Sequence, residues 1–193
     1  MYILEFIKKP FIWLKRFRKR RGYNVHSPFA FNFITTIIYQ RGTYYRYRDI
    51  NELPRFEMET RRILKLIFRL VNFMQPKTIY YRSNNSSLPK VMQWAKSDIE
   101  ISSEIEKYHK LDFVYLSFDQ NIDEIAHVID NLWSKFHSDT MFVLSGIGYS
   151  KPLYKVWYEL TQRKEAGISF DLYDVGILLF DKSKNKQDYI INY

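Results

Sequence analysis

Short apolar runs alternate with helical segments through the second half of the chain. The runs rich in β-forming residues are Thr78 to Tyr81, Ile99 to Ile101, Leu111 to Phe118 and Met141 to Leu144. Apolar residues at helical spacing lie between these runs and again from Leu153 to Leu160. Strands that alternate with helices pair in parallel and are covered by those helices, so the pattern predicts an α/β fold with a mostly parallel sheet.

The end of the chain departs from this alternation. Ile168 to Tyr173 and Val175 to Phe180 are separated only by Asp174, which leaves no room for a crossover helix. Strands joined this closely pair antiparallel. We therefore predict a C-terminal antiparallel hairpin, with Tyr189 to Ile191 extending the edge of the sheet.

Helices are expected before the sheet. Tyr2 to Phe17 carries apolar residues at helical spacing, interrupted by Pro10. Ser27 followed by Pro28 is typical of a helix start, because the serine side chain caps free amides and proline suits the first turn. A longer amphipathic helix is expected from Pro54 to about Phe73.

Positive charge is concentrated in residues 1–22. The whole chain has a net charge of +9, and this arm supplies +7 of it, from eight basic residues and the single acid Glu5. The basic residues toward its end are Lys15, Arg16, Arg18, Lys19, Arg20 and Arg21. A partner recognised by its negative charge is therefore expected to bind this arm.

Three hypotheses for the arm stay open. It is a helix whose aromatic face packs on the domain while its basic end is solvated, or an amphipathic helix on an anionic membrane surface. The third hypothesis is a nucleic-acid contact, since clustered lysines and arginines release counterions from phosphates. A protein partner, including a second copy of the chain, is also expected.

Composition and length exclude several kinds of site and indicate how the chain is divided into segments. The chain has no cysteine, so disulfides, thiolate metal sites and cysteine nucleophiles are impossible. The four histidines, at 26, 109, 127 and 137, lack metal-ligand spacing, and we predict no metal. No apolar run reaches the roughly 18 to 20 residues of a membrane span, and no secretory cleavage site is visible, so we expect a cytoplasmic protein. The length of 193 residues divides into a basic arm with helices, residues 1–74, and an α/β domain, residues 75–193.

The order of elements resembles the class I S-adenosylmethionine-dependent methyltransferase fold, a Rossmann-like sheet that ends in a hairpin. Arg21 to Ile34 (RGYNVHSPFAFNFI) is similar to the arm of a bacterial group of methyltransferase-like proteins with a His-Ser-Pro-Phe signature. The run LDFVYLSF resembles the fourth strand of the family, and Ser169 to Phe180 (SFDLYDVGILLF) resembles its closing hairpin. The resemblance implies S-adenosylmethionine as cofactor, bound across the carboxyl ends of the strands.

The residues expected to bind that cofactor have been replaced. Where the family has a glycine-rich turn after its first strand, this chain has Arg82 to Ser87, without glycine. The family's acids are missing at the ends of three further strands, which carry Ser102, Ser117 and Ser145-Gly146. If the cofactor is bound, the resemblance assigns it to Ser83, Asn84, Asn85, Ser87, Glu104, Ser117 and Asp119.

The sheet is expected to be truncated. Only Ser102 to Lys110 separates Ile101 from Leu111, whereas a crossover with its own helix takes about a dozen residues. The third strand of the family, with its flanking helices, is therefore missing. No catalytic residue is identified.

These departures lead to one hypothesis and two alternatives. The hypothesis is a degenerate methyltransferase-like protein, a pseudoenzyme that binds or scaffolds without catalysis and holds no cofactor. The first alternative is a divergent but active S-adenosylmethionine-dependent methyltransferase. The second is an RNA- or membrane-surface-associated module that acts through the basic arm.

Overall fold

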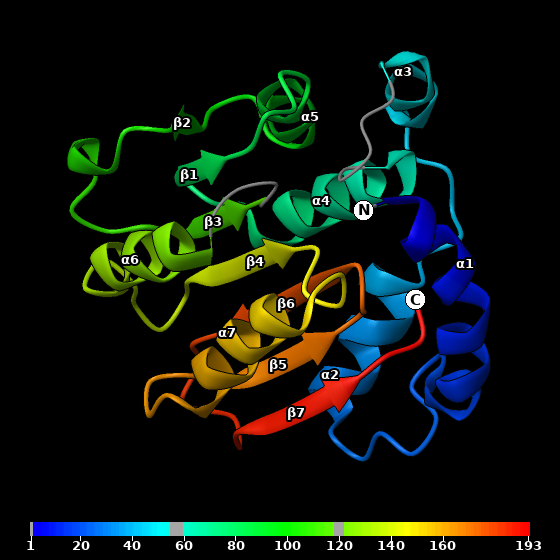
Figure 1. Ribbon diagram of the computed structural model, residues 1–193. Coiled ribbons are helices and arrows are strands. Elements are labelled where there is room, and N and C mark those ends of the chain that lie inside the picture. Colours follow the sequence, from blue (N-terminus) through cyan, green and yellow to red (C-terminus); the bar gives the residue numbers. More distant parts are fainter. Residues whose placement is uncertain (1, 55–59, 118–121) are drawn as a thin grey trace.

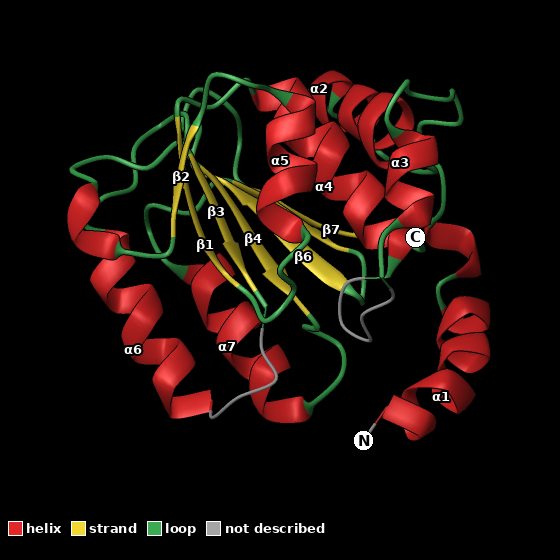
Figure 2. Cartoon of the chain, turned by 90° about the horizontal axis from the view of Figure 1, so that it is seen from above, coloured by secondary structure: helices red, strands yellow, loops and turns green. Residues whose placement is uncertain are grey.

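The fold is an α/β sandwich built on one sheet. The computed structural model describes residues 2–54, 60–117 and 122–193, with side chains described for residues 8–54, 60–117 and 124–193 (Figure 1). The sheet is covered on one face by α6 and α7 and on the other by α2, α4 and α5 (Figure 2). Helix α1 lies beside the sheet, outside both covering layers (Figures 1 and 2).

The sheet has seven strands in the order β2-β1-β3-β4-β6-β5-β7. Their bounds are β1 Thr78–Arg82, β2 Glu100–Ser102, β3 Phe113–Leu116, β4 Met141–Ser145, β5 Ile168–Asp171, β6 Val175–Leu179 and β7 Gln187–Ile190. Strand β6 runs antiparallel to its neighbours β4 and β5, and the other pairs are parallel. The predicted mostly parallel sheet with a C-terminal antiparallel hairpin is confirmed, and β7 forms the expected edge.

The helices follow the expected order with two differences. Their bounds are α1 Tyr2–Lys15, α2 Pro28–Asn32, α3 Tyr47–Glu52, α4 Arg61–Met74, α5 Leu88–Ala95, α6 Ile122–Trp133 and α7 Lys151–Gln162, with a π-helical turn, η2, at Phe33–Ile38. Helix α2 begins as predicted, because the Ala30 amide donates to Ser27 Oγ. The predicted start at Pro54 is wrong: α4 begins after Thr60, whose hydroxyl caps the Ile63 amide. The short helix α3 was not predicted.

The shortened connection after β2 is also confirmed. Between Ser102 and Phe113, all of which is described, the chain forms only the 3-10 turn η3, Ile105–Lys107. Strand β2 is therefore the edge of the sheet. Tyr108 fastens this connection, since its hydroxyl lies 3.2 Å from the carbonyl oxygens of both Ile79 and Glu100. Burial, with acidic neighbours, raises the pKa of Tyr108 to about 12, so the hydroxyl keeps its proton for donation.

Two apolar layers hold the sandwich together. One contains the buried faces of α6 and α7 with alternate residues of the central strands. The other joins residues of both chain segments, 1–74 and 75–193. At its centre Phe170 of β5 stacks on Phe33 of η2 with ring centroids 4.8 Å apart. The described chain contains no helix with the length and apolar composition needed to cross a bilayer.

Candidate functional site

The loop after β1 closes on its own side chains. The Asn85 amide donates to Ser83 Oγ at 3.0 Å, and the Ser87 amide donates to Asn85 Oδ1 at 2.9 Å. All residues of this loop are described, and none has a positive φ. The turn therefore needs no glycine. The backbone amides of Asn85 and Ser87 are already bonded within the loop.

The turn after β2 is also closed by one of its own side chains. The Glu104 amide donates to Ser102 Oγ at 3.0 Å, so the serine serves its own turn. The Glu104 carboxylate pairs with Lys107 at 3.2 Å, and its side chain is 66% exposed. The acid nearest to the ribose-binding position of the resembled family is thus engaged with a lysine at the surface.

An ion pair joins the ends of β1 and α6. Arg82, the last residue of β1, donates from its guanidinium to the Glu124 carboxylate. Beside it, the Ser117 amide donates to the Arg82 carbonyl at 2.9 Å and extends the pairing of β1 with β3. Ser117 is buried, and Asp119, the other candidate here, lies outside the described residues.

The end of β4 carries no acid. Gly146 has a φ of +78° and donates its amide to the Asp174 carbonyl at 2.6 Å. An aspartate or glutamate at this position would be strained, because residues with a Cβ rarely adopt that conformation. The preceding Ser145 is buried, and its Oγ has no hydrogen-bond partner among the described residues. Asn85 Nδ2 is likewise buried and has no described partner.

The described strand ends offer a few polar groups to a ligand. A ribose diol is often held by a carboxylate, and at the ends of β1 and β2 the acids Glu124 and Glu104 pair with Arg82 and Lys107. Asn85 Nδ2 and Ser145 Oγ are buried and have no partner among the described residues. These two atoms are neutral, so they suit a neutral hydrogen-bonding group.

The basic arm is fastened to the sheet by polar contacts. Arg16 donates two guanidinium N–H groups to the Asp171 carboxylate at 2.8 and 3.0 Å, and Lys9 pairs with Asp174 at 3.1 Å. The charge of Arg16 is thus paired within the protein, and its part in binding a polyanion stays a prediction. Phe11 and Leu14, on the same helix, are 72% and 67% exposed.

The other basic arm residues face solvent. Their side chains are exposed, and none forms an ion pair within the described chain: Lys15, Arg18, Lys19, Arg20 and Arg21. Contact of these residues with a nucleic acid or an anionic membrane stays a prediction.

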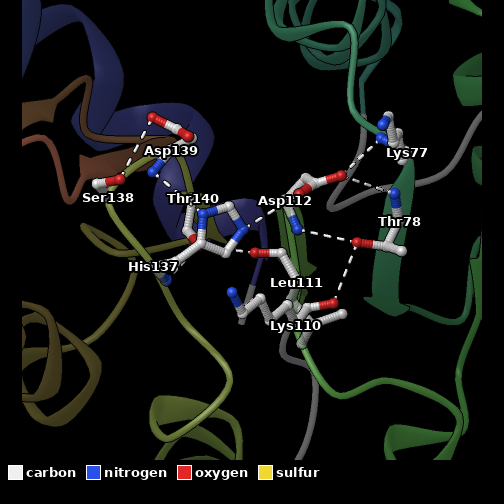
Figure 3. Close-up of polar contacts among 9 residues, drawn as sticks. All are labelled: Lys77, Thr78, Lys110, Leu111, Asp112, His137, Ser138, Asp139 and Thr140. Atoms are coloured by element: carbon white, nitrogen blue, oxygen red, sulfur yellow. Dashed lines mark hydrogen bonds and ion pairs between the residues drawn. The ribbon is translucent and has the colours of Figure 1, made fainter.

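A cluster that the sequence did not predict lies at the opposite, amino-terminal end of the strands (Figure 3). The Asp112 carboxylate accepts the amides of Lys77 and Thr78 at 2.6 and 3.0 Å and lies 3.1 Å from His137 Nε2. The Asp139 amide donates to His137 Nδ1 at 3.3 Å, which places the imidazole proton on Nε2, directed at Asp112. Both ring nitrogens are therefore used, and this pair joins β1, β3 and β4 rather than acting as an acid and base.

Replacing Asp112 with Ala is expected to lower the free energy of unfolding by about 1 to 3 kcal/mol at about pH 7, because the exposed Lys77 amide and the half-buried Thr78 amide lose a charged acceptor. Burial raises the pKa of the Asp112 carboxyl, but its bonds with Lys77, Thr78 and His137 outweigh this and hold the pKa below the usual range. A folded pKa below the unfolded value, about 3.9, gives stability that is present above it and lost as the pH falls through the folded pKa.

Urea unfolding of the wild type and the Asp112→Ala variant across the acid range checks this. The difference between the two proteins should shrink as the pH falls below about 4. Asp98→Ala is the matched control, since that side chain is 83% exposed and pairs loosely with Lys96. A difference that stays constant at low pH would contradict the assignment.

The described chain holds no group of three or more histidine, aspartate or glutamate side chains placed to bind a metal ion.

No protein-family model matches the sequence, and no curated protein matches it. Two solved structures have a similar chain path. A methyltransferase from Geobacter sulfurreducens is 10% identical with a TM-score of 0.49, over 71% of this chain and 85% of that one.

The second is the SAH-bound methyltransferase PaMTH1 of Podospora anserina. It is 8% identical to this chain with a TM-score of 0.48, over 80% of this chain and 96% of that one. At this level the comparison concerns chain path alone, and no residue role is transferred from either protein. The chain is an α/β protein whose mostly parallel sheet ends in an antiparallel hairpin.

Proposed function

We propose that this protein is a methyltransferase-like α/β protein that has lost its cofactor site and acts by binding rather than by catalysis. The proposal rests on one observation: the polar side chains at the carboxyl ends of β1 and β2 are bonded to other groups of the protein. The loop Ser83–Ser87 is closed by its own side chains, and Glu104 is paired with Lys107 at the surface. The acids Glu104 and Glu124 at these strand ends are each paired with a basic side chain.

The expected loss of binding free energy for an adenosyl ligand supports this proposal. A hydrogen bond to a charged group contributes about 1.5 to 3 kcal/mol, and the ribose diol would lose two such bonds. Each 1.4 kcal/mol is a tenfold change in affinity, so these losses alone weaken binding by about a hundredfold or more. The serine and asparagine side chains in the β1 loop also occupy volume that a glycine turn leaves to the ligand.

A thermal-shift titration with S-adenosylhomocysteine tests the proposal. A retained site saturated at about a hundred times its dissociation constant would add about 2.7 kcal/mol, which raises the Tm of a chain of this size by roughly 5 to 10 °C. We expect a shift of less than about 1 °C, equal to that with adenosine at the same concentration. A larger shift specific to S-adenosylhomocysteine would overturn the proposed loss.

One observation favours a second candidate, a divergent but active methyltransferase. Asn85 Nδ2 and Ser145 Oγ are buried without a partner at the ends of β1 and β4, on either side of β3. Buried polar atoms are usually satisfied, so such a pair is typical of a place where a ligand supplies the missing partner. The same titration separates the two candidates, because the active enzyme must bind its cofactor.

A further inference from the structure

A strongly basic cavity lies away from the strand ends, where the end of the arm meets α4 and the C-terminal segment. Its volume is about 760 Å³. Its walls come from Arg20 and Arg21, from the segment 38–43 that follows η2, from α4 and from the last two residues. Four stretches that are distant in sequence therefore contribute to one site.

The cavity is lined by six cationic side chains: Arg20, Arg21, Arg41, Arg62, Lys65 and Arg69. Among the residues that the structure describes, no aspartate or glutamate lines the cavity. None of the six forms an ion pair with a carboxylate of the described chain. The balance of the described lining is strongly positive, and an anion in the cavity would relieve this repulsion.

Arg69 brings positive charge to the wall of the cavity from within the protein. It is 4% exposed, and its partners are all neutral. Its Nε donates to the Ile37 carbonyl at 2.6 Å, and its terminal nitrogens donate to the Ile38 carbonyl and to the hydroxyls of Tyr47 and Tyr193. A buried cation is costly without a counter-charge, and the neighbouring protein groups supply hydrogen bonds but no carboxylate.

The remaining walls are preorganised for an anionic ligand. The Arg62 guanidinium lies 3.8 Å from the centre of the Tyr193 ring, and Lys65 Nζ lies 5.1 Å from that of Tyr47. These rings hold the charged ends in place without neutralising them. Because the Tyr47 hydroxyl accepts from Arg69, its own proton is free to be donated, and no described residue accepts it.

We propose that this cavity binds a ligand with two or more phosphate groups. A single small anion cannot contact cations on three separate stretches of chain, whereas a di- or triphosphate carries both the charge and the length. Guanidinium groups and a phenol donor suit phosphoryl oxygens, since arginine binds them through paired N–H groups. The site is independent of the strand ends, so it stands whether or not S-adenosylmethionine binds there.

Calorimetric titration of the full chain with sodium tripolyphosphate tests this site. The variant Arg41→Gln/Lys65→Gln removes two charges from the walls and leaves the buried Arg69 network intact. We expect tripolyphosphate to bind the wild type, and the double variant to bind at least about tenfold more weakly, from loss of charge-assisted hydrogen bonds. The matched control is Lys151→Gln/Lys155→Gln on α7, which makes the same charge change on the other face of the sheet and should leave the affinity unchanged.

Vesicles distinguish a soluble phosphate ligand from a lipid headgroup. Wild-type binding to phosphatidylcholine vesicles containing phosphatidylinositol 4,5-bisphosphate, lost in the Arg41→Gln/Lys65→Gln variant and blocked by tripolyphosphate, would assign the phosphates to a lipid. Tripolyphosphate binding without such vesicle binding would assign it to a soluble ligand. Absence of tripolyphosphate binding, or equal weakening by both double variants, would overturn the proposal.

Discussion

Replacing Asp171 with Ala is expected to lower the free energy of unfolding by about 3 to 5 kcal/mol, because it leaves a largely buried arginine without its counter-charge. Asp171 is 4% exposed at the end of β5 and accepts both N–H groups of Arg16. It also accepts the Tyr173 amide at 2.8 Å. One side chain thus fastens the arm and shapes the turn of the closing hairpin.

Urea unfolding measures the loss of stability, and limited trypsin digestion measures how firmly the arm is held. The Asp171→Ala variant should be cut faster after the basic residues that follow α1, since the arm loses its main anchor. Glu159→Ala is the control, because its carboxylate lies 3.7 Å from Lys155 and is 60% exposed. An exposed pair contributes at most about 1 kcal/mol, so equal losses in the two variants would contradict the role of Asp171.

Phe170→Ala is expected to destabilise the protein by a similar amount, about 3 to 5 kcal/mol, through lost burial and the cavity it leaves. Phe170 is fully buried between Phe33, with centroids 4.8 Å apart, and Tyr189 at 5.5 Å. The variant therefore loosens the contact between the π-helical turn η2 and two adjacent strands at once.

The control for this variant is Phe11→Ala, since Phe11 is 72% exposed on α1. Surface substitutions usually change stability by no more than about 0.5 kcal/mol. Urea unfolding of both variants should give a large loss for Phe170 and almost none for Phe11. A loss of several kcal/mol for Phe11→Ala would mean that the exposed face of α1 packs on the protein.

The sheet could be predicted because its signals are local. Each strand is a short apolar run, and the single residue Asp174 between two such runs dictates an antiparallel pair. The missing third strand followed from counting the residues after Ile101. The start of α4 was not predictable from Pro54, because the cap that decides it is Thr60, one polar residue among several.

The polar clusters could not be predicted, because their members are distant in sequence. Asp112 meets the amides of residues 77 and 78 and the ring of His137 only after three strands have paired. The contacts of the buried Arg69 could not be predicted either, because they join it to carbonyls of η2 and to the Tyr193 hydroxyl, all distant in sequence.

The residue types at the candidate cofactor site could be predicted from the sequence, but their hydrogen bonds and ion pairs could not. The sequence indicated a β1 loop without glycine and strand ends without acids. It did not indicate that Ser83, Asn85 and Ser102 bond to the amides of their own turns, or that Arg82 and Glu124 form an ion pair. The direction in which a short polar side chain turns depends on neighbouring backbone that forms only in the folded state.

Isothermal titration calorimetry with S-adenosylhomocysteine tests the proposed loss of the cofactor site most directly. The wild-type chain should give no saturable heat at ligand concentrations up to about 1 mM, which corresponds to less than about 4 kcal/mol of binding free energy. A single-site isotherm with a dissociation constant of about 10 µM or tighter would contradict the account, because it would mean that the serine and asparagine strand ends still hold an adenosyl ligand.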